Sequence, residues 1–308
     1  MLSISQTLEY LDVEIDEDFC KELETHDINT FYKIYNIRTG KAGKLRKIEE
    51  PCPKLKHLQR QLIPILEKFP LHKACCSRKG NNILNNAIIH KDAQHLLKLD
   101  IKECYHNISY LHIYRNLHCY SDFSYQNKVC LLYIIDKISM IEDRLPTGAP
   151  TSPILCNIAL TDLDCILQAL ANNTGHIYSR YMDDIHFSTK SKNRDLTIKD
   201  KIIEQCLNYN LQINTKKTRW MNKDSRDSMI VTGVSVGGTN RVPREFRRTI
   251  RSRLHQLGIH KKQIDQVTQG CLAYIKYIDP NEHQKLVEYY HRRVQYAGNN
   301  ERSGSSPE

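Results

Sequence analysis

The sequence predicts an α+β fold, in which helices and β-hairpins occupy separate segments of a chain that can bury a large core. Three observations lead to this prediction. Several segments carry apolar residues at helical spacing, and others alternate apolar and polar residues on both sides of a turn. The 308 residues, 40% of them hydrophobic, suffice for one large domain or for two to three closely packed subdomains.

Charge and composition exclude several classes of protein. A net charge of +10, from 45 Lys and Arg against 35 Asp and Glu, suits a polyanion such as nucleic acid. No apolar run approaches the roughly 18 residues that span a bilayer, so we expect no membrane partner. The N-terminus lacks a secretion signal, which predicts a cytoplasmic protein. Eleven cysteines without any CxxC pair predict free thiols in place of disulfides or a zinc site.

The first half of the chain is predicted to contain helices, one hairpin and one buried strand. The first 30 residues place Leu8, Leu11 and Ile15 on one helical stripe. The next elements are a hairpin over 32–48 with a glycine-rich, basic tip, ended by Pro51 and Pro53, a helix over 54–69 kinked at Pro64, a strand over 95–101, helices over 109–118 and 126–141, and a helix that begins after Pro153.

The second half begins with two strands over 176–189 that meet at a tight turn containing Asp183 and Asp184. A helix near 197–209 and a short hairpin over 229–238 follow. Residues 241–262 have a net charge of +7 and read as a helix with an apolar face and an arginine face. The small, polar residues 299–308 are predicted to be disordered.

Three carboxylates form a candidate metal site. Asp100 ends the predicted buried strand, and Asp183 and Asp184 lie at the apex of the predicted hairpin. Polymerising nucleotides requires two divalent cations about 3.5–4 Å apart, held by carboxylates that converge from separate segments. If the two segments are neighbours in one sheet, the three side chains meet at its end. Either segment alone is more often an ordinary turn or cap.

Five segments, which follow one another along the chain in the order that the family shows, carry a family resemblance. Tyr181–Asp184 resembles the YxDD signature of reverse transcriptases, Asp100–Tyr105 their first catalytic segment, and Leu145–Pro153 the segment under the template and incoming nucleotide. Asn86–His90 is similar to the NAxxH pattern of retron reverse transcriptases, and Val231–Gly233 to their VTG triplet near the primer grip. The resemblance extends from about Tyr32 to Tyr274 and is closest to the retron enzymes.

The resemblance implies a right-hand polymerase fold with fingers, a palm built on an antiparallel sheet, and a helical thumb. We expect an N-terminal helical segment over 1–30, fingers over 31–95, a palm over 96–240, an RNA-binding thumb over 241–298 and the disordered tail. Helices within 110–145 are expected to pack between fingers and palm. This division leaves no room for a further catalytic domain, so RNA removal is expected to need a host RNase H.

The resemblance also implies catalytic and metal-binding roles. Asp100, Asp183 and Asp184 are the expected catalytic carboxylates and ligands of two Mg²⁺ ions, with Mn²⁺ as a substitute. The Ile101 carbonyl is expected to add a further oxygen ligand.

Nucleotide contacts are implied in the same way. Tyr105 is expected to press on the sugar and exclude a 2′-hydroxyl, and Thr147, where the family often has Gln, to lie beside the nucleotide. Gly148 and Ala149 are expected to give a base pair room. Arg46, with Lys44 and Lys47 as alternatives, would clamp the triphosphate. Lys217, with Lys216 as its rival, would help to protonate pyrophosphate.

RNA contacts are expected from three places. Asn86 and His90 are expected to hydrogen-bond sugar or phosphate groups, although a helix cap and a satisfied histidine are the ordinary alternatives. Val231, Thr232 and Gly233 are expected near the primer. Phosphate contacts are expected from the arginine stripe Arg244, Arg247, Arg248 and Arg251.

By this resemblance the protein extends DNA from dNTPs on its cognate noncoding RNA. Retron enzymes start from the 2′-hydroxyl of an internal guanosine and produce a branched RNA–DNA, msDNA, usually beside a separate effector protein in defence against phage. One alternative is another prokaryotic reverse transcriptase, of the diversity-generating or abortive-infection type. Another is a non-catalytic RNA-binding scaffold that restrains a toxin.

Overall fold

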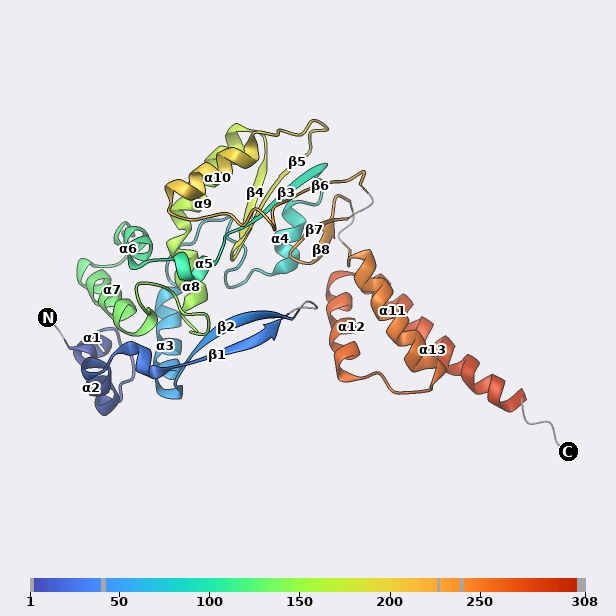
Figure 1. The fold of residues 1–308 in the computed structure, drawn as a ribbon, viewed down its shortest axis with the longest axis horizontal. Coiled ribbons are helices and arrows are strands. Elements are labelled where there is room, and N and C mark those ends of the chain that lie inside the picture. Colours follow the sequence, from blue (N-terminus) through green and yellow to red (C-terminus); the bar gives the residue numbers. More distant parts are fainter. Residues whose placement is uncertain (1–2, 40–42, 226–227, 239–240, 304–308) are drawn as a thin grey trace. The chain divides into compact units, whose positions relative to one another are not determined.

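The computed structural model describes residues 3–39, 43–225, 228–238 and 241–303 (Figure 1). The chain divides into two compact units. Unit 1 comprises Met1–Asn81, Lys98–Phe187 and Asp195–Thr218, and unit 2 comprises Asn82–Leu97, Ser188–Arg194 and Arg219–Glu308. The division passes through strands β3 (His95–Asp100) and β5 (Asp184–Thr189).

Unit 1 begins with short helices and the predicted hairpin. Ser3 and Asp16 cap α1 (Ile4–Tyr10) and α2 (Glu17–Thr25) by accepting backbone N–H groups. After the 3₁₀ turn Ile28–Phe31, β1 (Tyr32–Thr39) pairs antiparallel with β2 (Lys44–Pro51) in register. The hairpin prediction is confirmed, although residues 40–42 of its predicted tip lie outside the described residues.

Apart from the short α5, which was not predicted, the remaining helices of unit 1 lie where helices were predicted, to within a few residues. Pro53 occupies the first turn of α3, where its missing N–H costs nothing, and Pro64 lies inside that helix. The single helix predicted after Pro153 is two helices, because the helical conformation is interrupted at Leu160. The helices are α3 (Pro53–Leu66), α5 (Cys104–Asn107), α6 (Tyr110–His118), α7 (Tyr125–Ser139), α8 (Ser152–Ala159), α9 (Thr161–Asn173) and α10 (Ile198–Asn208).

A four-stranded sheet carries the candidate site, in the order β4-β5-β3-β6, with β4 (Ile177–Tyr181) at one edge and β6 (Arg219–Asn222) at the other. Side chains such as Leu99, Ile185 and Phe187 are fully buried. Helix α9 packs on β4, and α10 packs on α9 (Figure 1). The order makes β3 and β5 neighbours, as the three-carboxylate prediction requires.

Unit 2 has its own apolar core. A short hairpin, β7 (Met229–Val231) and β8 (Val234–Val236), packs against α4 (Ile83–Ile89). The helices α11 (Arg244–Ile259), α12 (Gln266–Ile278) and α13 (Pro280–Ser303) pack on one another. Their apolar faces supply the core residues Ile250, Leu254, Leu272, Ile275, Ile278 and Leu286.

Two features differ from the sequence predictions. Helices α4 and α5 and strand β6 were not predicted, since elements of four to seven residues carry too little periodicity. Helix α13 reaches Ser303, so residues 299–303 are helical and not disordered; residues 304–308 lie outside the described part. Among the described residues, no single helix is long and apolar enough to cross a membrane; only α8 with α9, bent by 49°, meets that test together.

Candidate active site

The two aspartates of the predicted hairpin lie at the tight turn between β4 and β5. Tyr181 ends β4, Met182 and Asp183 form the turn, and Asp184 is the first residue of β5. Met182 has a φ of 56°, in the left-handed region that residues with a side chain seldom occupy. The turn therefore holds an unfavourable backbone conformation next to both carboxylates.

Asp100 reaches the same place from the neighbouring strand. It is the last residue of β3 and is 6% exposed. The N–H of the next residue, Ile101, donates to the carbonyl of Asp183 at 2.9 Å. The pKa of Asp183 is raised by burial and by the charges of Asp184 and Asp100. The structure thus brings the three predicted carboxylates together at one end of the sheet.

Two lysines pair with two of the three carboxylates. The Nζ of Lys217 lies 2.5 Å from Oδ1 of Asp100, and the Nζ of Lys98 lies 2.6 Å from Oδ2 of Asp184. Lys217 is placed by a turn that begins at Asn214. The N–H of Asn214 donates to the Asp100 carbonyl at 2.8 Å. Lys98 was missed, although its position two residues before Asp100 puts both side chains on one face of the strand.

The donor set suits a divalent cation in its chemistry, because carboxylate and carbonyl oxygens are the ligands of hard ions. Within the described part of the chain, however, no three His, Cys, Asp or Glu side chains stand ready as a metal-binding group. The lysine contacts account for two of the carboxylates. Lys217 and Lys98 each contact one oxygen of Asp100 and Asp184, so a cation bound here would compete with the two lysines for these carboxylates.

Tyr105 lies within electrostatic reach of both Asp183 and Arg46. Tyr105 is in the short helix α5, which starts after Glu103, a residue with a φ of 47°. Burial raises the pKa of the Tyr105 hydroxyl, the charge of Asp183 adds to this, and the charge of Arg46 opposes it. Arg46 itself is exposed on β2, opposite Ile37. The sugar contact of Tyr105 and the triphosphate contact of Arg46 stay predictions, for two residues that interact electrostatically with each other.

The predicted nucleotide loop is tied to β2 by a carboxylate that the sequence analysis missed. Glu49, whose side chain is buried, accepts hydrogen bonds from Arg144 at 2.9 Å and from the Thr147 N–H at 3.2 Å. Lys47 adds an ion pair at 2.9 Å. Burial alone would raise the pKa of Glu49, but the hydrogen bonds from Arg144, Lys47 and Thr147 outweigh it and lower the pKa to about 2.

The packing of the loop on β2 leaves no space for a side chain at Gly148. A Cβ atom at this position would lie 2.4 Å from the carbonyl oxygen of Glu49. The neighbouring Thr147 also contacts β2, because its Oγ1 donates to the Lys47 carbonyl at 2.8 Å. The next residue, Ala149, is 5% exposed. Strand β2 fills the space on the Cβ side of Gly148, so packing alone already requires glycine here, and the expectation that Gly148 and Ala149 give a base pair room stays a prediction.

The predicted RNA contacts of Asn86 and His90 are at odds with their burial. Both side chains lie in unit 2 with 0% exposure. Asn86 donates to Oγ1 of Thr232 at 3.5 Å, and Nδ1 of His90 lies 2.7 Å from Oγ of Ser188. Burial lowers the pKa of His90 to about 3, which keeps the ring neutral. In this conformation the two side chains stabilise unit 2 and do not reach a bound RNA.

The predicted primer-grip triplet forms the turn of the β7–β8 hairpin. Val231 is fully buried, whereas Thr232 and Gly233 have φ values of 44° and 86°. Positive φ at both central residues is the requirement of a type I′ hairpin turn. Thr232 Oγ1 donates to the Ile83 carbonyl at 2.9 Å, and Tyr274 donates to the Gly233 carbonyl at 3.0 Å. The two segments that resemble retron enzymes therefore pack against each other.

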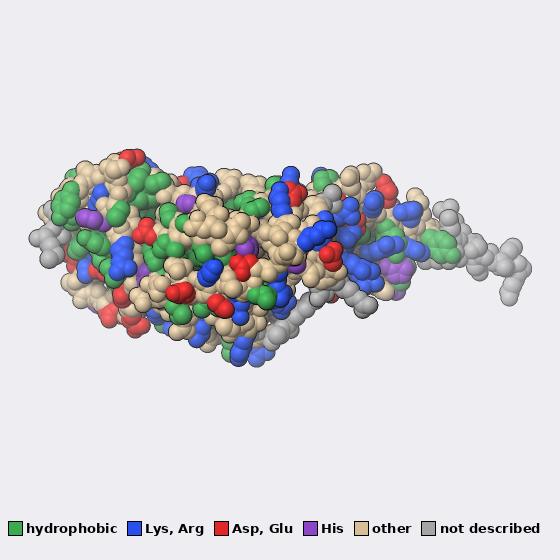
Figure 2. Space-filling model, turned by 90° about the horizontal axis from the view of Figure 1, so that it is seen from above, with side chains coloured by type: hydrophobic (Ala, Val, Ile, Leu, Met, Phe, Trp, Pro, Cys, Tyr) green, Lys and Arg blue, Asp and Glu red, His purple; other side chains and the backbone are tan. Residues whose placement is uncertain are grey.

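The four predicted phosphate-binding arginines of α11 do not share one environment. Arg244, Arg248 and Arg251 are exposed, and the Arg251 guanidinium lies over the Tyr289 ring at 4.5 Å. Arg247 is turned toward α13, where it pairs with Glu282 at 3.4 Å. Lys and Arg side chains gather over this helical region (Figure 2). The predicted stripe is corrected to three exposed arginines and one that holds two helices together.

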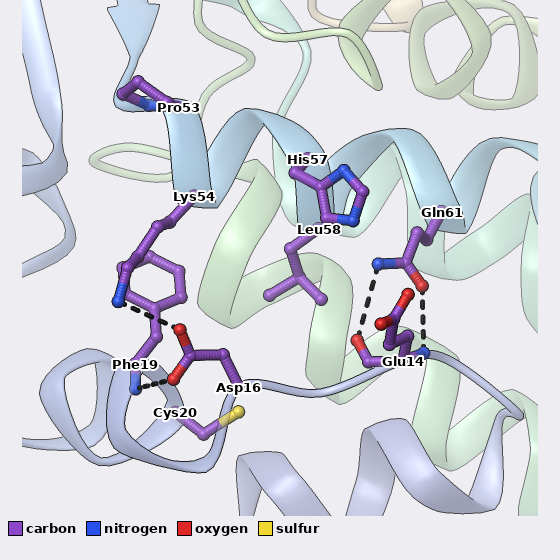
Figure 3. A pocket seen from close by; sticks show the side chains of 9 residues that line it. All are labelled: Glu14, Asp16, Phe19, Cys20, Pro53, Lys54, His57, Leu58 and Gln61. Atoms are coloured by element: carbon purple, nitrogen blue, oxygen red, sulfur yellow. Dashed lines mark hydrogen bonds and ion pairs between the residues drawn. The ribbon is translucent and has the colours of Figure 1, made fainter.

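A pocket of about 330 Å³ lies away from these residues, between the N-terminal segment and α3 (Figure 3). Asp16 contacts Lys54 there at 2.9 Å, and Glu14 and Gln61 share two hydrogen bonds. None of the residues that line it was predicted as a site residue.

Comparison with known proteins shows which family the chain belongs to. Residues 37–269 match the model of the family described as reverse transcriptase (RNA-dependent DNA polymerase). The chain belongs to the reverse transcriptase family. The matched range contains every predicted catalytic, metal-binding and nucleotide-binding residue. Members of this family generally use divalent metal ions.

Its relatives place it among the retron reverse transcriptases. The chain is 28% identical over 275 residues to the retron Ec86 reverse transcriptase of Escherichia coli, covering 87% of this chain and 83% of that protein. It is 30% identical over 284 residues to the retron Ec73 reverse transcriptase of Escherichia coli, covering 87% and 89%. The retron reverse transcriptase prediction is confirmed, and the protein is an RNA-directed DNA polymerase.

Solved structures support the right-hand polymerase fold. The apo telomerase of Candida tropicalis matches with a TM-score of 0.53 and 16% identity, over 92% of this chain and 60% of that one. The telomerase of Candida albicans, in complex with a fragment of telomeric RNA, matches with a TM-score of 0.51 and 14% identity, over 90% and 57%. At these identities the likeness concerns the fold alone, and it confirms the predicted fold class.

Proposed function

We propose that the protein copies part of its cognate noncoding RNA into DNA, with Asp100, Asp183 and Asp184 as the catalytic carboxylates. The observation that carries the proposal is the meeting of the β3 end with the β4–β5 turn, joined by the hydrogen bond from Ile101 to Asp183. Convergent carboxylates from separate segments are what nucleotidyl transfer needs.

Two divalent cations, Mg²⁺ with Mn²⁺ as a substitute, are the cofactors that this donor set suits. Asp100 and Asp183 would be the main ligands, supported by Asp184 and the Ile101 carbonyl. When bound, the cations would lower the pKa of the primer hydroxyl and neutralise charge on the leaving pyrophosphate. Lys217, released from Asp100, is then placed to hold a proton for the leaving pyrophosphate.

The incoming dNTP is proposed to lie between β2 and α5. Arg46 is exposed and would bind the triphosphate, while the Tyr105 ring would face the sugar and collide with a 2′-hydroxyl. Thr147 and Glu49 hold the neighbouring loop against β2, which keeps the position of that loop fixed. In this arrangement residues 31–95 serve as fingers, 96–240 as palm and 241–298 as thumb.

The biological role that we propose follows the retron relatives. Synthesis would start from a 2′-hydroxyl of the noncoding RNA in the cytoplasm and leave a branched RNA–DNA, msDNA. A host RNase H would remove copied RNA. A separate effector protein would act with the complex in defence against phage.

The test is to purify the protein with its bound nucleic acid and to digest the sample with RNase. A resistant DNA strand that bears a short RNA remnant supports the proposal, and the Asp183→Asn variant is expected to lack that strand. RNA without DNA in the wild type, with phage protection intact in the variant, would instead favour a non-catalytic scaffold.

A further inference from the structure

The left-handed Met182 is held by hydrogen bonds on both of its backbone groups. Its N–H donates to Oγ of Ser77 at 3.0 Å, and its carbonyl accepts from Nη1 of Arg180 at 3.0 Å. A residue in this sparsely populated conformation persists only where its surroundings fix it. Ser77, 105 residues away in sequence, therefore acts directly on the turn that contains Asp183.

The backbone delivers Ser77 to this position along the edge strand. The N–H of Arg180 donates to the Ala74 carbonyl and the N–H of Cys76 donates to the Arg180 carbonyl, both at 2.8 Å. Cys75 and Arg180 form a parallel bridge. Segment 74–77 thus runs beside β4 and ends next to the β4–β5 turn. Its last residue, Ser77, contacts the Met182 backbone.

A buried polar network fixes Ser77 in turn. Its hydroxyl donates to Oδ1 of Asn157 at 3.1 Å, and Nδ2 of Asn157 donates to the Ser77 carbonyl at 2.9 Å. Arg180, with 0% exposure, donates to the same Asn157 oxygen at 2.9 Å and to both carboxylate oxygens of Asp164 at 2.8 and 2.7 Å. Charged bidentate pairs of this kind are strong and rigid.

We propose that Ser77 is a positioning residue of the polymerase, which holds the left-handed backbone of Met182, and with it the turn that contains Asp183, through one oxygen atom. This inference rests on the proposed catalytic role of Asp183 and Asp184. It assigns to segment 74–77 a part in positioning the turn that contains Asp183, and it makes Asn157 and Arg180 the residues that orient the Ser77 hydroxyl. We expect little change in nucleotide binding, because Arg46, Tyr105 and Thr147, which are proposed to lie at the nucleotide, make none of these hydrogen bonds.

The test compares Ser77→Ala, Ser77→Thr and Ser124→Ala in the full chain on a primed RNA template. Ser124 caps α7 by accepting the Asn127 N–H at 3.1 Å, so its alanine variant loses a similar bond away from the turn. We expect Ser77→Ala to lower kcat by about ten- to a hundred-fold with little change in the KM for dNTP. Threonine, which keeps the oxygen, restores kcat. Ser124→Ala keeps wild-type kcat.

Binding of Mn²⁺, followed by electron paramagnetic resonance without substrate, gives a readout independent of turnover. Weaker binding in Ser77→Ala, restored in Ser77→Thr, supports positioning. Equal kcat and equal Mn²⁺ affinity in Ser77→Ala and Ser124→Ala would overturn the proposal. If the alanine variant does not fold, Ser77→Cys replaces it in both measurements, because its thiol is only a weak hydrogen-bond acceptor. An active Asp183→Asn variant would instead refute the catalytic assignment itself.

Discussion

Glu49 shows how a single buried charge can connect two predicted site segments. It lies on β2, and its partners Arg144 and Thr147 belong to the loop about a hundred residues later. Removing one partner of a buried ion pair leaves the other charge without compensation. The carboxylate therefore contributes to stability and to the position of the nucleotide loop.

Replacing Glu49 by Gln is expected to lower the free energy of unfolding by about 3 kcal/mol at pH 7. The folded-state pKa, near 2, is below the ordinary 4.5, so this stability is present above pH 4.5 and is lost as the pH falls toward 2. Urea unfolding from pH 7 to pH 3 should show the two proteins converging in acid. Glu9→Gln, at an exposed position on α1, is the control. A constant gap across this range would contradict the assignment.

The sequence predicted some residues of the site and not others, for a physical reason. Asp100, Asp183 and Asp184 stand at strand ends, and strand periodicity is a local signal. The partners of Glu49, and the contact of Ser77 with Met182, depend on residues distant in sequence. Burial is equally non-local, so Asn86 and His90 were taken as RNA contacts although the fold encloses them.

The elements show the same dependence on length and context. Long periodic helices such as α7 and α11 were predicted to within a few residues, whereas the four residues of β6 were not. An arginine face could be read from α11, but the pairing of Arg247 with Glu282 required the position of α13. Packing between elements, more than propensity, determines which side chains stay available for RNA.

The packing of the 145–151 loop on β2 can be tested with one added methyl group. Gly148→Ala places a Cβ 2.4 Å from the Glu49 carbonyl oxygen, so we expect a loss of about 1–3 kcal/mol in stability and a higher KM for dNTP. Gly270→Ala on α12, where no atom lies within 4 Å of the added Cβ, should be neutral or stabilising. Wild-type stability in Gly148→Ala would show that the loop is not held this closely.

Helix α11 allows a test of which arginines meet RNA. Arg248→Ala is expected to weaken RNA binding and to reduce the slope of log K against log salt by about 1. Arg247→Ala, whose side chain faces Glu282, should leave that slope unchanged and lower stability instead. Fluorescence anisotropy at several salt concentrations measures the slope for both variants. The reverse pattern would place Arg247, and not Arg248, on the RNA.

Across the whole molecule, charge is distributed unevenly. The net charge is +10, yet the first 27 residues carry nine acidic side chains against one lysine, while residues 241–262 have a charge of +7. Attraction to RNA must therefore come mainly from later parts of the chain, including the exposed arginines of α11. The acidic group at the end of the sheet is a local exception that needs counter-charge, which Lys217 and Lys98 supply here.

Incorporation of a single dNTP on a primed RNA template, with and without Mg²⁺, tests the central claim most directly. The account predicts extension by the wild type that requires the metal, and a loss of at least about a thousandfold in Asp100→Asn and in Asp183→Asn. Both variants should remain folded by circular dichroism. Extension at wild-type rates by either folded variant would contradict the assignment of these carboxylates to catalysis.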